Sequence, residues 1–440
     1  MGGRGAARTT SRFSHWHVMS GSWRRPRVAG MKPSTPPPSF VHQPGSSLLR
    51  VAFVTETFPP ELNGVAMTAG RLLNGLNTAG HKVRIIRPRQ EGEDMAHVHC
   101  FSDLPTTLVR GIGVPGYNGI RFGLPAGGML RRMWRQDRPD VVHIFTEGPL
   151  GRSALHAARA LELPLVAGYH THFDRYTEHY RFGLLRQQVT AYLRRFHNRC
   201  HVNLVPTGEL VRQLQEGGMQ NVRVLSRGVD KNQFNPALRS ESLRQSWGVQ
   251  ADDLVMLCVG RLAAEKNLEL VVQAWLAVRR SQPRAKLVLV GAGPEQERLS
   301  RQYPGVIFTG SVSSQELGMY YASADLFAFA SMSETFGNVV QEAMASGLAV
   351  VGFDYAAAHE LIVNGRNGIL VPFDDAEAFV NATASLAQQP QLVRELGHVA
   401  SLAGKSWQSV IQDLIAAYHD AIEMAHQVQE VPHAATRQRA

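Results

Sequence analysis

Short apolar runs alternate with amphipathic stretches along most of the chain, and the alternation begins at Leu49. In the first half, the pattern predicts strand 48–55, helix 67–79 ending before Gly80, strand 81–86, strand 141–145, helix 153–161 and strand 165–169. Strands that are separated by helices of this length are typical of βαβ units. The first half is therefore expected to hold a parallel sheet.

A second series of alternating runs follows the segment 227–230. It predicts strands 254–260, 286–290, 306–309, 326–330 and 349–353, with helices near 267–280, 294–302, 314–322 and 338–346. A polar stretch around Asn235-Pro236 interrupts the pattern, which places a boundary between the halves near 226–240. A last helix is expected over 407–428. The prediction is an α/β protein with two parallel halves.

The excess of positive charge lies almost entirely at the N-terminus. Residues 1–50 hold eight Lys or Arg and no Asp or Glu, which leaves 38 basic and 36 acidic residues in the remainder of the chain. That remainder is nearly neutral, so binding of a polyanion by the whole protein is not expected. Residues 1–48 are rich in Arg, Ser, Pro and Gly, and we expect them to be disordered. A transit peptide and a non-functional extension with translation from Met31 both fit this tail, and we favour the extension.

The remaining composition excludes several classes of protein. The three cysteines Cys100, Cys200 and Cys258 are far apart, so neither a disulfide framework nor a structural zinc site is expected. No apolar run approaches 18 residues, so no membrane-spanning helix is expected. With 440 residues, the chain is long enough for two domains.

Two cationic residues follow the first strand of the second half. Arg261 comes directly after Gly260, and Lys266 precedes Asn267, a good residue to begin a helix. Side chains at the carboxyl end of a parallel sheet face the ligand in open α/β folds. Arg and Lys there suit a phosphate group. A pair of solvated surface cations is the alternative.

A pair of glutamates lies further along the same half. Glu334 precedes an expected helix start at Gly337-Asn338, and Glu342 lies beyond the first helical turn. A helix N-terminus offers free backbone N–H groups to an anion, and carboxylates accept hydrogen bonds from hydroxyls. Together with Arg261 and Lys266, these residues predict a site for a sugar joined to a diphosphate. The loop 291–294 also resembles a phosphate loop, but we expect it to be a structural turn with Pro294 at the first position of the next helix.

The first half offers weaker candidates. Gly64 follows the first strand, where it would allow close approach to a ligand, and an ordinary βα turn explains it equally well. His170 and His172 follow an apolar strand, but no third ligand at useful spacing accompanies them, so we expect no metal. Residues 181–200 hold five Arg and no acid with apolar residues at helical spacing. Such a helix either packs against the core or docks on anionic lipid.

These motifs resemble those of the retaining glycosyltransferases of family four, which have the GT-B fold, and the resemblance covers residues 49–425. It is carried by Gly260-Arg261 with Lys266, by Glu334 and Glu342 around Phe336-Gly337, and by Arg227-Gly228-Val229-Asp230. It implies two Rossmann-like domains that face each other across a cleft. The implied parts are a tail 1–48, an acceptor-side domain 49–226, a nucleotide-sugar domain 227–405 and a helix 406–428 that crosses back.

The resemblance also implies roles for individual residues. Arg261 and Lys266 would bind the donor diphosphate, Glu334 the transferred sugar and Glu342 the ribose. His170 corresponds to the histidine of the catalytic site, and Arg261, Lys266 and Glu334 count with it as catalytic. Gly64 would form the glycine loop beside the phosphates, and Val312 would lie near the base. Phe336 and Gly337 would place backbone amides near the sugar and phosphate, and Asn338 would also belong to the donor site.

The stretches 55–65 and 169–176 resemble one subgroup, which contains GDP-mannose-dependent α-mannosyltransferases and sulfoquinovosyl-diacylglycerol synthases. This implies a hexosyltransferase that uses GDP-mannose, or else a UDP-sugar, and that glycosylates a lipid or glycan without a cofactor or metal. It also implies a cytoplasmic protein with peripheral membrane contact and no nucleic-acid partner. A nucleotide-sugar epimerase, a phosphorylase and a non-catalytic nucleotide-sugar-binding protein are the alternatives.

Overall fold

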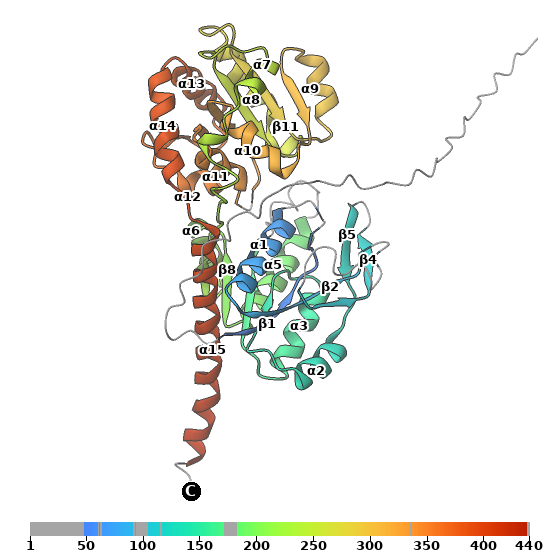
Figure 1. Ribbon diagram of the computed structural model, residues 1–440. Helices are drawn as coiled ribbons and strands as arrows, with labels where there is room; N and C mark the ends of the chain where they lie inside the picture. Colours follow the sequence, from blue (N-terminus) through green and yellow to red (C-terminus); the bar gives the residue numbers. More distant parts are fainter. Residues whose placement is uncertain are drawn as a thin grey trace, which may run out of the picture. The chain divides into compact units, whose positions relative to one another are not determined.

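The computed structural model describes residues 48–59, 61, 64–90, 93, 104–114, 117–170, 183–334 and 336–437. Residues 47–440 group into one compact unit, which contains two separate parallel sheets (Figure 1). The α/β class with two Rossmann-like halves is therefore confirmed. Residues 1–47 of the expected tail, Cys100, His172 and parts of the stretches 55–65, 169–176 and 181–200 lie outside the described residues.

The sheet of the N-terminal half has seven parallel strands in the order β3-β2-β1-β6-β7-β8-β9. The strands are β1 Arg50–Val54, β2 Lys82–Pro88, β3 Thr106–Val109, β6 Val141–Ile144, β7 Leu165–Gly168, β8 Val202–Val205 and β9 Val222–Val224. The helices are α1 Gly64–Thr78, α2 Gly127–Gln136, α3 Pro149–Arg159, α5 Gly183–His197 and α6 Gly208–Glu216. The central strands β6, β7 and β8 are buried along their whole length, as in sheets covered on both faces.

The chain order changes direction between β1 and β6. Val51 to Val54 pair with β2 on one side and with β6 on the other, and both neighbours are parallel. The connection between β3 and β6 includes an antiparallel pair that the sequence did not predict, β4 Gly111–Val114 and β5 Tyr117–Gly123. The connection after β1 therefore runs toward β2, and the connection after β6 runs the opposite way toward β7. The two loops separate, which leaves a crevice at the carboxyl edge of the sheet.

The sheet of the C-terminal half has the order β12-β11-β10-β13-β14-β15. Its strands are β10 Val255–Val259, β11 Lys286–Val290, β12 Ile307–Gly310, β13 Leu326–Phe329, β14 Ala349–Phe353 and β15 Ile369–Val371. Its helices are α7 Glu241–Ser246, α8 Leu268–Val278, α9 Gln296–Gln302, α10 Ser314–Ala322, α11 Asn338–Ala345, α12 Ala356–Leu361, α13 Ala376–Ala387 and α14 Pro390–Leu402, with 3₁₀ turns at Pro236–Leu238 and Ala264–Lys266. The order in which the chain adds strands to this sheet reverses between β10 and β13.

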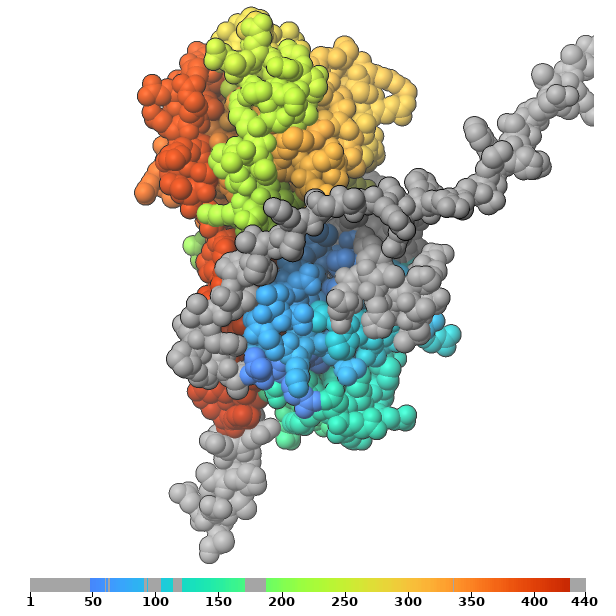
Figure 2. All heavy atoms as spheres, in the orientation of Figure 1, coloured from blue at the N-terminus to red at the C-terminus, as the bar shows by residue number. Residues whose placement is uncertain are grey.

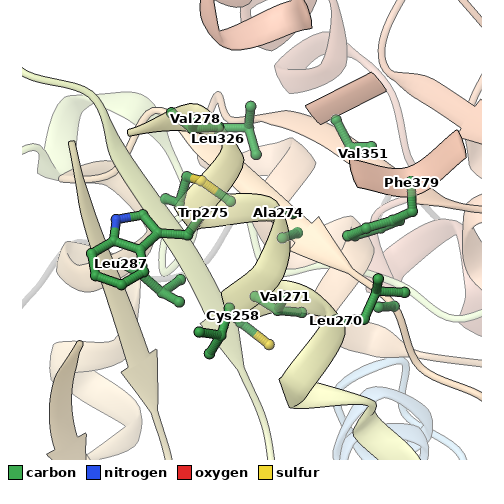
Figure 3. Close-up of a cluster of buried hydrophobic side chains, with 14 of the residues drawn as sticks. Cys258, Leu270, Val271, Ala274, Trp275, Val278, Leu287, Leu326, Val351 and Phe379 are labelled. Atoms are coloured by element: carbon green, nitrogen blue, oxygen red, sulfur yellow. The ribbon is translucent and has the colours of Figure 1, made fainter. Parts of the chain in front are cut away.

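The core of the C-terminal half forms where α8 and α13 cover one face of this sheet. Val271, Ala274 and Trp275 of α8 pack with Leu287 of β11 and Phe379 of α13 (Figure 3). The neighbouring helix α14 lies at the surface in the space-filling view (Figure 2). Burial of each large apolar side chain contributes about 1.5–3 kcal/mol to folding stability. The cluster therefore holds in place the strands that carry the site residues.

The last helix differs from the expectation in length. α15 runs from Trp407 to Arg437, beyond the expected end at residue 428. Its apolar face joins the core of the N-terminal half, with Ile411, Leu414 and Tyr418 buried among residues of β1, β6 and β8. The hydroxyl of Tyr418 lies 2.8 Å from Nδ1 of His143 on β6. No helix among the described residues has the length and apolar content needed to cross a bilayer.

Candidate active site

The loops after β10 and β13 meet at the crossover point of the C-terminal sheet. Met332 donates its backbone N–H to the carbonyl of Glu265 over 2.8 Å, which ties the second loop to the first. The turn after β11 packs against the first loop so closely that a side chain at Gly291 would overlap the carbonyl of Gly260. That turn therefore has the structural function that the sequence indicated. Pro294 is not at the first position of α9, which begins at Gln296, so that detail was wrong.

The two cations that the sequence selected project from the first of these loops. Arg261 is exposed, whereas Lys266, at the end of a 3₁₀ turn, is half-buried. Asn267 adopts the left-handed conformation, with φ of 51°, and its side chain does not cap α8. The left-handed residue turns the chain sharply after Lys266 and directs the lysine toward the second loop.

Lys266 forms an ion pair with Glu334 in the second loop, between Nζ and Oε1. The lysine side chain is 21% exposed and the glutamate side chain 15%. The hydroxyl of Tyr355 donates to the carbonyl of Glu334 over 2.8 Å and so fixes the glutamate backbone. The ion pair compensates the charges of both partly buried side chains. A ligand with phosphate and hydroxyl groups could replace it, because its phosphate would pair with Lys266 and its hydroxyls would bond to Glu334.

The helix N-terminus that the sequence predicted is α11, which begins at Asn338 after Gly337. Gly337 has φ of 95°, a left-handed conformation that costs other residues roughly 1–2 kcal/mol. A Cβ atom there would lie 3.1 Å from the ring of Phe329. The glycine therefore lets the loop turn into the helix and leaves the first N–H groups of α11 directed at the cavity.

Glu342, one helical turn further on, lies against a tyrosine that the sequence analysis missed. Tyr321 of α10 donates its hydroxyl to Oε2 of Glu342 over 3.0 Å. Burial raises the pKa of Glu342, while that hydrogen bond and the charge of Arg71 on α1 lower it. Arg71 was also missed, because it occurs in an ordinary helical pattern with no motif around it.

His170 lies at the end of β7 and is buried. Its Nδ1 is 2.9 Å from Nη2 of Arg227, which can only donate, so Nδ1 accepts and Nε2 carries the ring proton. The ring of Phe145 lies 3.9 Å away between centroids. Burial and the charge of Arg227 hold the pKa of His170 well below its usual value, so the imidazole is neutral near pH 7.

A cavity of about 620 Å³ collects nearly all of these residues. Its lining includes Gly64, His170, Arg261, Lys266, Glu334, Phe336, Gly337, Asn338 and Glu342, together with Arg71 and Arg227. Val312, expected near the base, is not among the lining residues and is half-buried after β12. A Cβ atom at Gly64 would meet no atom within 4 Å, so any larger residue would extend into open space.

Among the described residues, no group of three or more His, Cys, Asp or Glu residues is arranged to hold a metal ion. The charge that the cavity offers to an anion comes instead from Arg261, Lys266 and Arg71 and from the N-terminus of α11. The arrangement suits a diphosphate that carries neighbouring hydroxyl groups.

Two family models and several known proteins are similar to this chain. Residues 62–233 match the family model described as Glycosyltransferase Family 4, and residues 253–389 match the model of group 1 glycosyl transferases. A GDP-mannose-dependent alpha-mannosyltransferase of Corynebacterium glutamicum is 32% identical over 86% of this chain and 91% of that protein. The chain belongs to the family-four glycosyltransferases. It is thus a hexosyltransferase, as the resemblance implied.

Other relatives extend the range of donors and acceptors. An alpha-monoglucosyldiacylglycerol synthase of Streptococcus pneumoniae is 28% identical over 73% of this chain and 75% of that protein. Among solved structures, the Anabaena protein HepE in complex with UDP aligns with a TM-score of 0.63 and 19% identity, over 88% of this chain and 100% of that chain. At that identity the structural match establishes the GT-B fold of this family-four glycosyltransferase.

Proposed function

We propose that this family-four glycosyltransferase transfers a mannosyl residue from GDP-mannose to a lipid hydroxyl with retention of the anomeric configuration. The observation that carries the proposal is the position of Arg261, Lys266 and the α11 N-terminus at the crossover of β10 and β13. Open α/β sheets bind nucleotides at this point. The choice of GDP-mannose is supported by relatives with that donor in their names, at 32–34% identity.

The bond that breaks joins the anomeric carbon of the sugar to an oxygen of the β-phosphate. Negative charge grows on that oxygen, and Arg261, Lys266 and the backbone N–H groups at Gly337-Asn338 stabilise it. The N–H groups of the α11 N-terminus are fixed by the helix before the donor arrives, whereas Lys266 must first exchange Glu334 for the phosphate. No metal or other cofactor is needed in this mechanism.

The acceptor hydroxyl attacks the face from which the nucleotide leaves. Its proton passes to the departing phosphate oxygen, so that a new C–O bond replaces the broken one and the leaving group is GDP. Glu334 would bind hydroxyls of the sugar, and Glu342 those of the ribose. His170, neutral with its proton on Nε2, would donate a hydrogen bond to the sugar rather than act as a base.

The proposal is tested by offering the purified protein GDP-mannose, UDP-glucose and UDP-sulfoquinovose. GDP-mannose is expected to raise the melting temperature most, by mass action, and to be consumed when a diacylglycerol glycolipid is added. The anomeric configuration of the product is read by NMR. Arg261→Ala with Lys266→Ala should abolish transfer, while Arg301→Ala, an exposed arginine on α9, should not.

A UDP-sugar donor is the second candidate, because a monoglucosyldiacylglycerol synthase and a sulfoquinovosyl transferase of Arabidopsis thaliana are among the relatives. Transfer from UDP-glucose or UDP-sulfoquinovose in place of GDP-mannose would establish it. Conversion of the donor without an acceptor would indicate an epimerase, and donor binding without turnover a binding protein. A lipid acceptor would place the enzyme at a membrane surface, on the cytoplasmic side, where nucleotide sugars are available.

A further inference from the structure

Arg227 lies in the segment that joins the two halves of the chain, directly before Gly228. The segment 227–230 carries part of the family resemblance, but no role has yet been given to the side chain of this arginine. The residue is 6% exposed and lines the proposed donor cavity. Burial lowers the pKa of its guanidinium to about 10, so the group remains charged near pH 7. Arg227 is therefore a nearly buried cation in the wall of the cavity.

The charge of Arg227 has no anionic partner within the described residues. Its hydrogen bond there joins Nη2 to Nδ1 of His170 over 2.9 Å, and that imidazole is neutral. Among the carboxylates that line the cavity, Glu334 is already paired with Lys266. A buried charge without an opposite charge is strongly unfavourable. The ligand-free protein thus holds an uncompensated cation, which a bound anion would stabilise.

Arg244 of α7 shows how the same protein treats an arginine that stabilises the fold. It is 1% exposed, and its Nη1 donates to a carboxylate oxygen of Asp325 over 3.1 Å and to the carbonyl of Ser323 over 2.9 Å. Its Nη2 donates to the carbonyl of Asp253 over 2.7 Å. A carboxylate and several carbonyls therefore compensate this guanidinium. The contrast indicates that Arg227 is buried for the sake of a ligand.

The other N–H groups of Arg227 are accessible from the cavity. A guanidinium has several N–H donors, and His170 accepts from one of them. In the described part of the chain, no nitrogen of Arg227 is both enclosed and without a partner, so the remaining donors face the cavity. The backbone beside them is fixed, because Gln341 of α11 donates Nε2 to the carbonyl of Gly228 over 2.8 Å. Arg227 is thereby held in a constant position relative to α11, whose N-terminus lines the same cavity.

We infer that Arg227 is a further donor-binding residue: one N–H holds His170, and the others bond to oxygens of the donor diphosphate. Hydroxyl groups of a hexose carry no charge, so the diphosphate is the part of the donor that compensates the cation. The planar fork of an arginine also suits two phosphate oxygens at once. The inference rests on the proposed function for the identity of the nucleotide, whereas contact with a diphosphate does not depend on the base or the sugar.

Calorimetry with GDP, GMP and guanosine tests this contact in Arg227→Met. The Kd for GDP should rise roughly 10–100-fold through loss of charge-assisted hydrogen bonds, and the Kd for GMP should rise less. Guanosine should bind as it does to the wild type. Arg227→Lys keeps the charge and should bind GDP more tightly than Arg227→Met does. Arg301→Met, at an exposed position of α9, is the control and should bind GDP as the wild type does.

Unfolding of the ligand-free proteins in denaturant separates a ligand-binding role from a structural one. Arg227→Met should unfold close to the wild-type midpoint, because removal of an uncompensated buried charge offsets the lost bond to His170. Arg244→Met should unfold at a clearly lower denaturant concentration, because Asp325 and several carbonyls lose a buried partner.

A Kd for GDP in Arg227→Met within about twofold of the wild type would overturn the inference. Equal losses for GDP and guanosine would also overturn it, because the effect would then lie outside the diphosphate. So would a fall in the unfolding midpoint as large as that of Arg244→Met, which would make Arg227 structural. If UDP binds in place of GDP, with the same dependence on Arg227, the proposed donor fails and the contact with the diphosphate stands.

Discussion

Replacement of Lys266 by methionine isolates one charge in the donor cavity while keeping much of the side chain's length. In the ligand-free protein Lys266 is paired with Glu334, and both side chains are mostly buried. The substitution therefore has two effects. It removes a cation from the expected position of the diphosphate, and it leaves the carboxylate of Glu334 without that partner.

The size of the first effect follows from the charge separation. Two unit charges 4 Å apart interact by about 4 kcal/mol at an effective dielectric constant of 20. Because donor binding must first release Lys266 from Glu334, about 1 kcal/mol is lost from that value. A net loss of about 2–3 kcal/mol corresponds to a roughly 30–150-fold higher Kd for GDP. The free energy of unfolding should fall by only about 1 kcal/mol.

Calorimetry with GDP and GMP provides the assay, because GMP lacks the β-phosphate and should lose less affinity than GDP. Arg301→Met is the control: Arg301 pairs with Glu297 on the surface of α9, and both side chains are more than 75% exposed. A Kd for GDP within twofold of the wild type, in a folded Lys266→Met protein, would refute the assignment of Lys266. Equal losses for GDP and GMP would refute its contact with the β-phosphate.

Three further outcomes follow from individual positions. Gly337→Ala should cost about 1–2 kcal/mol in denaturant unfolding, because its φ is 95° and the new Cβ meets Phe329; an unchanged midpoint would contradict this. Tyr418→Phe should cost about 1–3 kcal/mol, because His143 loses its 2.8 Å hydrogen bond in the core, and equal stability would argue against that contact. Burial raises the pKa of Glu56 from 4.5 to about 7, so the folded state binds more protons than the unfolded state between these values. The wild type should therefore lose up to about 3 kcal/mol of stability relative to Glu56→Gln as pH rises from 4.5 to 7. If the stability of the two proteins changes in parallel with pH, the raised pKa of Glu56 is wrong.

The sequence predicted the parts of the fold whose signals are local. Buried parallel strands are continuous apolar runs, so strand 349–353 and helix 314–322 agree with the structure at both ends. The pair β4–β5 was missed because its segments, with Gly at 111, 113, 116, 119 and 123, lack the alternation of a half-buried strand. Proline misled the prediction at α9, since residue 294 suits a helix start as well as the turn that precedes it.

The candidate donor site was predictable because its residues are grouped around two loops. Arg261 and Lys266 are five positions apart, and Glu334 lies close to the helix start that follows it. The partners that fix these groups come from elsewhere in the chain. Tyr321 of α10 bonds to Glu342, and Arg71 of α1 lines the same cavity, but nothing in the sequence indicates that residues so far apart meet. The position of β1 beside β6 could not be predicted for the same reason, because strand order depends on pairing between distant segments.

Each half has a cavity at the carboxyl end of its sheet: the proposed donor cavity in the C-terminal half and one of about 1040 Å³ beside β1 and β6 in the N-terminal half. The two differ in the residues that follow the strands. In the C-terminal half those loops carry cations and a helix start, which attract phosphate. In the N-terminal half the loops after β1 and β6 carry Glu56 and Glu147, which the protein itself bonds, beside mostly apolar walls. The chain passes between the halves twice at one place, where Val229 donates its N–H to the carbonyl of Lys405 over 2.9 Å. Gly228 allows this contact, since a Cβ atom there would lie 2.6 Å from the backbone nitrogen of Trp407, where α15 begins its course into the N-terminal core. Both crossings therefore meet beside the proposed donor cavity, which Gly228, Val229 and Trp407 also line, so that a movement of one half relative to the other would alter the proposed site of transfer.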